Sequence, residues 1–323
     1  MAEHEIILFG LHLKINPVAF SVGSFSIYWY GIIIAVGFSL AVVYAWRKAP
    51  KFGINLDRML DVVLVTTPLA VLCARAYYLI FDGDGIHSFS QFFGIKSGGF
   101  AGLAIYGGVI GAAVIGPLMC KWRKVNIASM LDLASIGFLI GQGIGRWGNF
   151  TNQEAFGIAT GSSWFGMTSR NVERVLGVGE LAHPCFLYES VWCLVGAFLL
   201  HKIGKNRRFN GQVALSYCMW YGLGRAVIEG LRTDSLYLGS TGIRVSQLLS
   251  VLAVIVAAVL YAVFWKRLKT AKRDTEYQPM FGEMPDAVMT AEGTPEEPAE
   301  PETEPDSGEE SMQTEAIDHG DDH

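Results

Sequence analysis

Seven long apolar stretches run through this 323-residue sequence, and they constrain its fold more than any other feature. A helix needs about 20 consecutive apolar residues to cross a bilayer, and each stretch approaches that length. Only 17% of the residues are charged, against about 25% in soluble domains. The sequence therefore predicts an all-α integral membrane protein with about seven transmembrane helices. Their approximate bounds are 25–46, 58–81, 100–120, 127–147, 185–201, 211–230 and 245–265.

The placement of basic residues predicts the orientation of these helices. Lys and Arg cluster after the first, third, fifth and seventh stretches, and the loops near 82–99, 148–184 and 231–244 carry few of them. Because cytoplasmic loops are enriched in Lys and Arg, we expect the N-terminus outside and the C-terminus in the cytoplasm. The first residues lack the basic region and small-residue cleavage site of a signal peptide, so we expect none to be removed. The segment 1–24 and a small insertion at about 148–184 would then be extracytoplasmic.

An acidic segment ends the chain. Residues 274–323 hold 17 acidic residues and no Lys or Arg, whereas residues 1–273 hold 25 basic and 13 acidic residues. A segment this poor in large apolar residues cannot bury enough surface to offset the entropy lost on ordering. We therefore expect a disordered cytoplasmic tail at 274–323.

Polar residues gather at the end of the fourth stretch, in the segment GQGIGRWGNFTNQEAFG at 141–157. Arg146, Asn149, Asn152 and Glu154 come together where the chain should be leaving lipid. A charge near hydrocarbon is costly, so an arginine at this depth is a candidate functional residue. A glycine-rich helix end that snorkels an arginine into the headgroups would explain Arg146 alone. It explains the neighbouring amides and the carboxylate less well.

Polar residues from other helices should reach the same depth. The helical rise of about 1.5 Å per residue gives the depth of each residue. Some of these polar residues come late in helices that run outward, and others come early in helices that run inward, so both groups reach the outer half of the bilayer. Arg225 and Glu229 are four residues apart and could pair with each other, which is a purely structural reading of those two. Several arginines exceed what packing requires, and arginine is a preferred ligand for phosphate. The sequence thus predicts a site for a phospholipid headgroup in the outer half of the bilayer. The residues at this depth are Tyr30, Arg75, Tyr106, Arg146, Tyr188, Glu189, Arg225 and Glu229.

Several familiar chemistries leave no motif in the sequence. It contains no G-x-S-x-G elbow, no H-E-x-x-H zinc helix and no Walker-type phosphate loop. The five cysteines lie within or beside apolar stretches, which is typical of small buried residues rather than of a disulfide framework. We therefore predict no metal site. We also predict no nucleic-acid partner, because topology already explains the basic loops. His183 opens the fifth stretch, either in a supporting role at the site or as a helix cap.

The polar segment reads G-R-x-G-N-F-x-N-x-E-x-x-G from Gly145 to Gly157. This string resembles the signature of the bacterial phosphatidylglycerol–prolipoprotein diacylglyceryl transferases. The resemblance covers most of residues 15–267 and leaves out the acidic tail. Further similar pieces are YWYG at 28–31, the Arg75 region, the glycine-rich stretch at 98–111, H-P-x-x-L-Y-E at 183–189 and R-x-x-x-E at 225–229.

The resemblance implies that residues 25–273 form a seven-helix catalytic domain in the bacterial cytoplasmic membrane, inner or sole. The enzyme would move a diacylglyceryl group from phosphatidylglycerol to the lipobox cysteine of a prolipoprotein. That reaction forms a thioether, releases glycerol phosphate and begins lipoprotein maturation. Its partners would be phosphatidylglycerol, lipobox peptides and the lipid bilayer, with no cofactor. The alternative is a phospholipid or anion transporter that uses the same arginines, although the internal repeat common in transporters is not evident.

The resemblance also assigns roles residue by residue. Arg146 and Arg225 would hold or neutralise phosphate, and Asn149 would hydrogen-bond the headgroup. Glu154 and Glu229 would orient these arginines or the headgroup glycerol. Further substrate-binding positions are Tyr30, Arg75, Asn152, Gly157 and His183.

The proton acceptor for the attacking thiol stays open. Some family members carry a histidine just before the paired glycines of the third stretch, where this chain has Tyr106 before Gly107 and Gly108. A tyrosine with an ordinary pKa of about 10 is a poor base at neutral pH. Either a nearby arginine activates Tyr106, or a glutamate or a water takes the proton.

Overall fold

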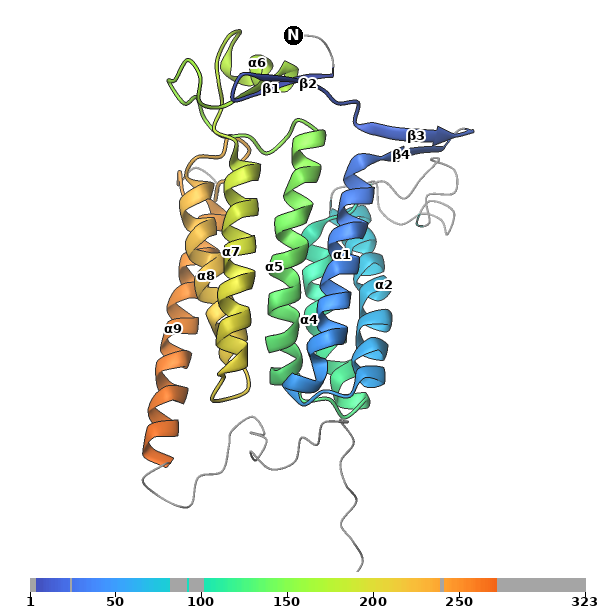
Figure 1. Ribbon diagram of the computed structural model, residues 1–323, viewed down its shortest axis with the longest axis vertical. Helices are drawn as coiled ribbons and strands as arrows, with labels where there is room; N and C mark the ends of the chain where they lie inside the picture. Colours follow the sequence, from blue (N-terminus) through green and yellow to red (C-terminus); the bar gives the residue numbers. More distant parts are fainter. Residues whose placement is uncertain (1–3, 24, 82–91, 93–101, 239–240, 272–323) are drawn as a thin grey trace, which may run out of the picture. The chain divides into compact units, whose positions relative to one another are not determined.

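The computed structural model describes residues 4–23, 25–81, 92, 102–238 and 241–271. Within these residues seven helices have 18 or more residues and run alongside one another (Figure 1). The tail predicted at 274–323 and most of the loop at 82–101 lie outside the described residues. The seven helices are α1 (Trp29–Lys48), α2 (Leu56–Phe81), α4 (Ile105–Trp122), α5 (Ile127–Thr151), α7 (Cys185–Lys205), α8 (Gln212–Glu229) and α9 (Val245–Ala271).

In the described part of the chain, six of these helices are long and apolar enough to cross a membrane. The seventh, α8, carries Gln212 in its first turn and Arg225 and Glu229 near its end, which lowers its apolar character. These polar side chains are not exposed, because α8 packs between α7 and α9. The prediction of an all-α integral membrane protein is confirmed, and the predicted orientation stays a prediction.

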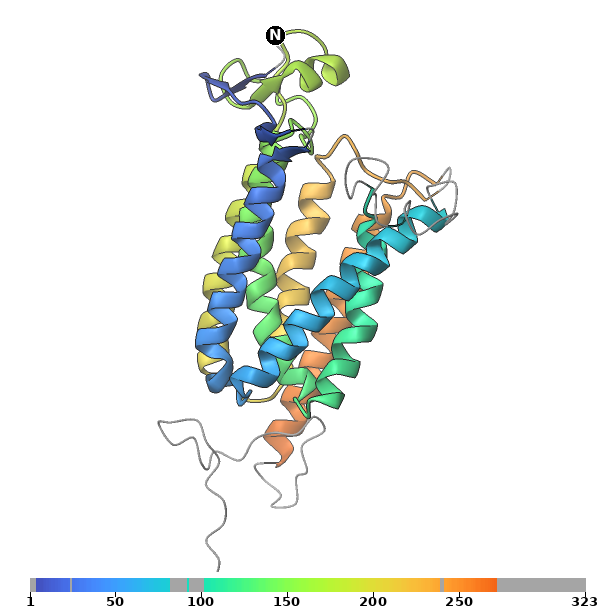
Figure 2. The ribbon, with the colours of Figure 1, turned by 90° about the vertical axis from the view of Figure 1, so that its right-hand side faces the viewer.

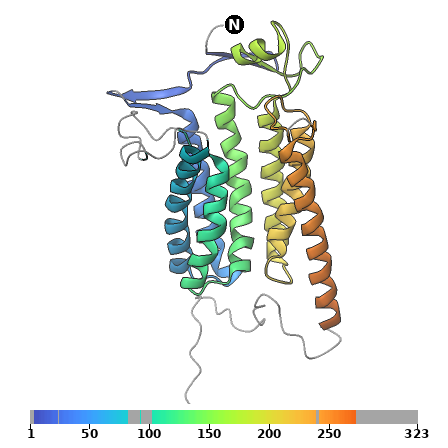
Figure 3. The same cartoon turned by 180° about the vertical axis from the view of Figure 1, so that it is seen from behind.

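Helix α5 lies at the centre of the fold. It packs on α1, α7 and α8, and half of its apolar stretch is buried. Helices α2 and α4 form a separate pair that leans away from α1 toward the Phe81 end of α2 (Figure 2). Seen from behind, α9 flanks the α7–α8 side of the fold (Figure 3). Helices α1, α7 and α8, which carry or adjoin predicted site residues, therefore pack directly on α5, whereas Arg75 lies on α2 of the separate pair.

A buried carboxylate fixes α5 against the start of α8. Asp132 is fully buried and accepts hydrogen bonds from the backbone N–H of Gly211 and of Ala214, both at 2.8 Å. Arg207 adds an ion pair at 3.2 Å. Since unpaired N–H groups at a helix N-terminus need an acceptor, Asp132 serves as a cap supplied by another helix. This contact sets the relative height of α5 and α8 at the end opposite the predicted site.

Short strands cover the other end of the bundle, and they were not predicted from the sequence. Strands β1 (Glu5–Leu8) and β2 (Leu11–Lys14) form a hairpin, and β1 also pairs antiparallel with β5 (Met167–Ser169). Strands β3 (Val18–Val22) and β4 (Phe25–Tyr28) form a second hairpin that leads directly into α1. Helix α6 (Arg170–Leu176) follows β5.

A small apolar core ties these strands to the helix ends. Ile6 of β1, Met167 of β5 and Phe186 of α7 are essentially inaccessible to solvent. Phe150 of α5 stacks on Phe186, with 4.7 Å between the ring centroids. Because Phe150 takes part in this core, α5 continues to Thr151 instead of ending near residue 147 as predicted. The signature segment therefore begins inside a helix, and its first residues are held by regular hydrogen bonds.

Candidate active site

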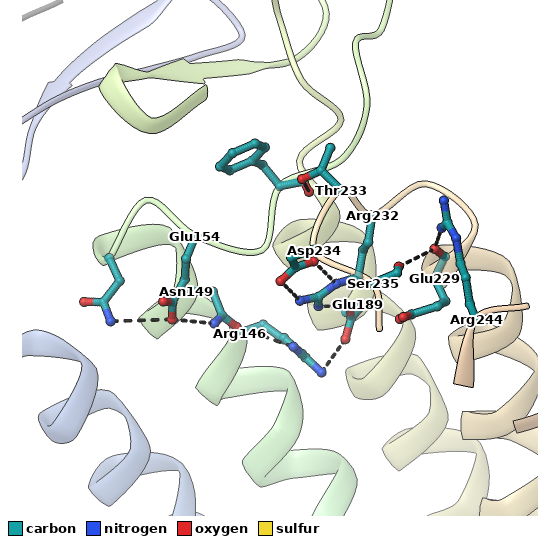
Figure 4. A network of polar contacts seen from close by, with 12 residues as sticks. Arg146, Asn149, Glu154, Glu189, Glu229, Arg232, Thr233, Asp234, Ser235 and Arg244 are labelled. Atoms are coloured by element: carbon teal, nitrogen blue, oxygen red, sulfur yellow. Dashed lines mark hydrogen bonds and ion pairs between the residues drawn. The ribbon is translucent and has the colours of Figure 1, made fainter. Parts of the chain in front are cut away.

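The last turns of α5 present a line of polar side chains. Arg146 donates from Nη1 to Asn149 Oδ1 at 3.5 Å, and Asn149 donates from Nδ2 to Glu154 Oε1 at 2.9 Å. Asn152 also donates to Glu154 Oε1, at 3.5 Å. The carboxylate of Glu154 is thereby directed back toward the helix that precedes it (Figure 4).

The backbone after α5 turns sharply to make this possible. Gln153 and Ala155, on either side of Glu154, have φ values of 56° and 58°. Non-glycine residues rarely adopt this left-handed conformation, and such residues cluster at functional sites. The backbone N–H of Glu154 donates to the carbonyl of Asn149 at 3.0 Å, which closes the turn. The strained turn is thus what brings the carboxylate beside the two amides.

Glu189 joins the arginines of three different elements. Its Oε1 accepts from Nη1 of Arg225 at 3.1 Å and from Nη1 of Arg232 at 3.2 Å. Its Oε2 forms an ion pair with Nη2 of Arg146. These partners come from α5, from α8 and from the loop that follows α8. Glu189 comes from the first turns of α7, and Figure 4 shows it with Arg146 and Arg232. One carboxylate, only 4% exposed, therefore organises the arginine cluster.

The neighbouring residue on α7 sets the position of Glu189 relative to α5. Ser190 donates from its hydroxyl to the carbonyl of Gly143 at 2.7 Å. The indole N–H of Trp147 donates to the same hydroxyl at 3.2 Å. Both partners belong to α5, one turn before and one residue after Arg146. The α5–α7 contact therefore delivers Glu189 to Arg146.

A second buried carboxylate lies on α8. Glu229 Oε2 pairs with Arg225 Nη2 at 2.5 Å, which confirms the predicted pair four residues apart. The backbone carbonyl of Glu229 accepts from Nη1 of Arg244 and from the hydroxyl of Ser235. Arg225 thus lies between Glu189 and Glu229, and its guanidinium is held by both.

The loop after α8 contributes an arginine and a carboxylate. Arg232 binds Asp234 through two parallel hydrogen bonds, from Nε at 2.9 Å and from Nη2 at 2.6 Å. Burial alone would raise the pKa of Asp234, but these bonds and the charge of Arg232 outweigh it, so the pKa lies below its usual value. Burial would lower the pKa of Arg232, and Asp234 and Glu189 reverse this effect and raise it. Both groups are therefore ionised at neutral pH.

Gly157 allows three segments to meet beneath this loop. A Cβ on Gly157 would come within 2.8 Å of His183 Cβ, 2.9 Å of Cys185 Sγ and 3.0 Å of the Leu231 carbonyl. Gly157 donates from its backbone to the carbonyl of His183 at 2.9 Å and lies in a β-bridge with Arg232. The absence of a side chain at Gly157 thus allows close packing between parts of the protein, and this packing places Arg232.

Tyr30 lies beside the signature segment, as the sequence predicted from depth. Its ring packs on Gly148, and the charges acting on its hydroxyl are those of Glu154 and Arg146. Tyr30 is 38% exposed, so one face of the ring remains open. It forms part of the wall between α1 and the end of α5.

The other predicted residues lie outside the Glu189 cluster. Arg75 is buried in α2 and donates to the carbonyls of Phe92 and Gly102, at 3.1 Å and 3.0 Å, on the segment that leads into α4. Tyr106 lies in the first turn of α4 and is 44% exposed. His183 Nδ1 contacts the Tyr188 hydroxyl at 3.1 Å. Arg75 and Tyr106 thus belong to the α2–α4 pair, and His183 belongs to the start of α7.

Four functional candidates were not among the predicted site residues. Glu189 was recognised by its depth and its motif but not assigned to the site, although it is the centre of the cluster. Arg232, Asp234 and Arg244 lie in or beside a loop that has no periodic pattern. The spacing R-x-D in an outer loop next to R-x-x-x-E was the only signal available in the sequence. Among the described residues, no three His, Cys, Asp or Glu side chains gather as a metal site requires.

The cluster can hold an anion at the end of the bundle. Arg146, Arg225 and Arg232 have side chains that are 20%, 17% and 11% exposed, so each is reachable but largely withdrawn from solvent. Guanidinium groups in such surroundings bind carboxylate and phosphate strongly, because the local dielectric constant is low. The same arrangement would stabilise negative charge that develops on a leaving phosphate.

Comparison with known proteins supports this chemistry. A profile of the family described as prolipoprotein diacylglyceryl transferase matches residues 17–263. A phosphatidylglycerol–prolipoprotein diacylglyceryl transferase of Clostridium perfringens is 43% identical over 261 residues, which cover 80% of this chain and 98% of the relative. An enzyme of the same name from Bacillus velezensis is 38% identical over 79% of this chain and 93% of the relative. Another, from Bacillus cereus, is 39% identical over 83% of this chain and 99% of the relative. The acidic segment 274–323 lies beyond the matched residues.

Proposed function

This chain belongs to the prolipoprotein diacylglyceryl transferase family, and from that premise we propose that it transfers a diacylglyceryl group from phosphatidylglycerol to a prolipoprotein. The acceptor would be the lipobox cysteine, and the products a thioether-linked lipoprotein and glycerol phosphate. The observation that carries the proposal is the set of three arginines held on Glu189. It supplies cationic groups where a phosphate must bind and depart.

The reaction exchanges one bond to carbon for another. The cysteine thiol loses its proton, and the thiolate attacks the glyceryl carbon bonded to the phosphate oxygen. The S–C bond forms as the C–O bond breaks, and the electron pair leaves with glycerol phosphate. Arg146 and Arg225 stabilise the charge that collects on the leaving oxygens.

The remaining residues orient the headgroup. Glu189 and Glu229 hold the arginines at fixed positions, so little reorganisation is needed when charge develops. Asn149, Asn152 and Glu154 offer amide and carboxylate groups to the glycerol hydroxyls. Tyr30 packs beside the donor lipid, and Gly157 fixes the segment that carries Arg232. Arg75 and His183 contact the donor from the α2–α4 pair and from the start of α7.

Two side chains are candidates for accepting the thiol proton. Glu154 is exposed and accepts a hydrogen bond from Asn149, which in turn accepts one from Arg146, whereas Tyr106 lies on the α2–α4 pair. Asp234 is a poor candidate, because Arg232 lowers its pKa. Replacing Tyr106 with Phe and Glu154 with Gln separates the two. The variant that lacks the true base loses the rise of rate with pH, and the other keeps it.

The proposed setting is the bacterial cytoplasmic membrane, with the arginine cluster on its extracytoplasmic side. The orientation follows from the basic loops, which all lie at the opposite end of the helices. The strands and α6 then form an extracytoplasmic cap over the site.

A product assay tests the proposal. Purified protein is incubated with phosphatidylglycerol and a lipobox peptide, and mass spectrometry follows the thioether and glycerol phosphate. We expect Arg146→Ala to lose at least about 10²-fold in turnover, since it removes a charge stabiliser. Arg174→Ala, on the exposed face of α6, is the matched control and should retain activity. Lipid that crosses the membrane with its headgroup intact and no thioether would support the transporter instead.

A further inference from the structure

The structure contains a hollow at the end of the bundle opposite the arginine cluster. It has a volume of about 380 Å³, is open at the surface of the protein and lies between α1, α5 and α7. Glu189 and His201 both lie on α7, twelve positions apart, so this hollow begins roughly 18 Å from the arginine cluster. Its lining residues are Tyr44, Lys48, Ile136, Ile140, Ala197, Phe198 and His201.

The wall of the hollow is apolar and its rim is polar. Ile136, Ile140 and Phe198 supply the wall. At the rim, the hydroxyl of Tyr44 and Nδ1 of His201 are 2.8 Å apart, and their rings meet edge to face. An apolar channel with a polar mouth suits a molecule that has a hydrocarbon chain and a polar head.

Positive charge surrounds the mouth. The charges that act on His201 are those of Lys205, Lys48 and Lys51. Lys202 lies over the Phe198 ring, 4.4 Å from its centroid. Within the described residues, none of these four lysines takes part in an ion pair.

Two carboxylates at this end of the bundle are engaged elsewhere. Asp132 is paired with Arg207, and Asp61 with Arg123. Among the described residues no carboxylate forms an ion pair with these lysines, and an anion would complete the site.

We propose that this hollow binds one anionic phospholipid of the leaflet opposite the arginine cluster. One acyl chain lies along Ile136, Ile140 and Phe198, and the phosphate lies among Lys48, Lys205 and the His201 edge. A second copy of the chain docked through the same face would bring two sets of lysines together, which disfavours that occupant. The proposal requires only a membrane-embedded protein and does not depend on the transferase reaction.

Native mass spectrometry with defined lipids tests the site. The probes are dioleoyl phosphatidylserine and dioleoyl phosphatidylcholine, so neither is the proposed donor. We expect the wild type to retain phosphatidylserine preferentially. Lys48→Gln with Lys205→Gln should weaken this binding about 25-fold, since each lysine near an anionic headgroup contributes about five-fold. Lys121→Gln with Lys269→Gln removes the same charge from exposed sites on α4 and α9 and should change little.

A second variant tests the hollow without changing its charge. Ile140→Trp fills the channel and leaves all the lysines in place, so it should also reduce phosphatidylserine retention. If the Lys48/Lys205 variant and the Lys121/Lys269 variant lose phosphatidylserine binding equally, the binding reflects general surface charge and the proposal is overturned. Displacement of the lipid by inorganic phosphate would indicate a bare anion site. A dimer whose abundance falls in the Lys48 and Lys205 variant, with unchanged lipid binding, would assign the hollow to a second copy.

Discussion

At the scale of single residues, Glu189 is the group on which the site depends. It is 4% exposed, and a buried carboxylate is tolerated only when it is paired. Its three partners also need it, because three guanidinium groups repel one another without an intervening negative charge. The carboxylate and the arginines therefore stabilise one another.

Replacing Glu189 with Gln should lower transferase turnover about 10²-fold, because the arginines lose their common anchor and shift from the positions that fit the leaving phosphate. The product assay measures this, with circular dichroism as a check on helix content. Glu180→Gln, in the exposed turn before α7, changes the same charge without touching the cluster and should be neutral. Equal rates for both variants would show that the anchor is dispensable.

Asp234 makes the loop after α8 sensitive to acid. Its pKa is lowered from 3.8, chiefly because hydrogen bonds from Arg232 overcome the effect of burial. Because the pKa is lower in the folded state, the ionised carboxylate stabilises the protein fully at pH values above the unfolded-state pKa of 3.8. This stabilisation is lost as the pH falls through the folded-state pKa. Asp234→Asn should therefore have a lower Tm than the wild type at pH 7, and the gap should close below pH 3.8. A Tm gap that is constant down to the most acidic buffer would contradict this coupling.

The sequence predicted the residues of this site unevenly. Arg146, Asn149 and Glu154 lie within nine positions of one another, so a single segment revealed them. Arg225 and Glu229 share a helix face, and their pairing followed from spacing alone. Arg232 and Asp234 were missed because their position depends on a β-bridge to Gly157, a contact across 75 residues that no local pattern records.

At the scale of elements, two tryptophans lock α7 to α8. The indole N–H of Trp192 donates to the carbonyl of Trp220 at 2.9 Å, and the Trp220 N–H donates to the carbonyl of Trp192 at 3.0 Å. The rings stack with 4.2 Å between centroids. Glu189 lies one turn from this reciprocal pair on α7, and Arg225 follows it on α8. The pair therefore fixes the register in which Glu189 meets Arg225.

Gly224→Ala tests this register. A Cβ at Gly224 would collide with the pyrrole edge of Trp192, so the two helices must shift. We expect turnover to fall by about 10- to 10²-fold, since a displacement near 1 Å is enough for such a loss. Gly116→Ala is the control, because the nearest atom to a Cβ there is a methyl group 3.8 Å away. Adding Trp192→Phe to the Gly224 variant should restore part of the rate, and no recovery would argue against the tryptophan contact as the cause.

The helices were predictable and the strands were not, for a physical reason. A membrane helix forms all its backbone hydrogen bonds locally, so a run of apolar residues is sufficient to reveal it. Strands β1 to β5 have three to five residues each, too few for a clear alternation, and β1 depends on a partner from the distant insertion. Even the α5 boundary shifted, because Phe150 is held by tertiary contacts that composition does not encode.

At the scale of the whole molecule, charge asymmetry predicts which end faces the cytoplasm. Cysteines introduced for labelling can read it out, since all five native cysteines are buried or partly buried. In intact cells, Ser162→Cys in the insertion should react with a membrane-impermeant maleimide. Asn206→Cys, between α7 and α8, should react only after the membrane is opened. The reverse pattern would place the arginine cluster in the cytoplasm and remove the basis for the proposed reaction.

The pairing of β1 with β5 also has a consequence for how the protein is made. Ile6 can pair with Ser169, its partner in the sheet, only after Ser169 has been synthesised. At a synthesis rate of about 5–20 residues per second, that delay is on the order of ten to thirty seconds. During it, one edge of β1 has no strand to pair with, and the cap that the strands form over the helix ends remains unassembled. A newly made chain therefore inserts four of its seven described long helices, α1, α2, α4 and α5, before this cap can assemble.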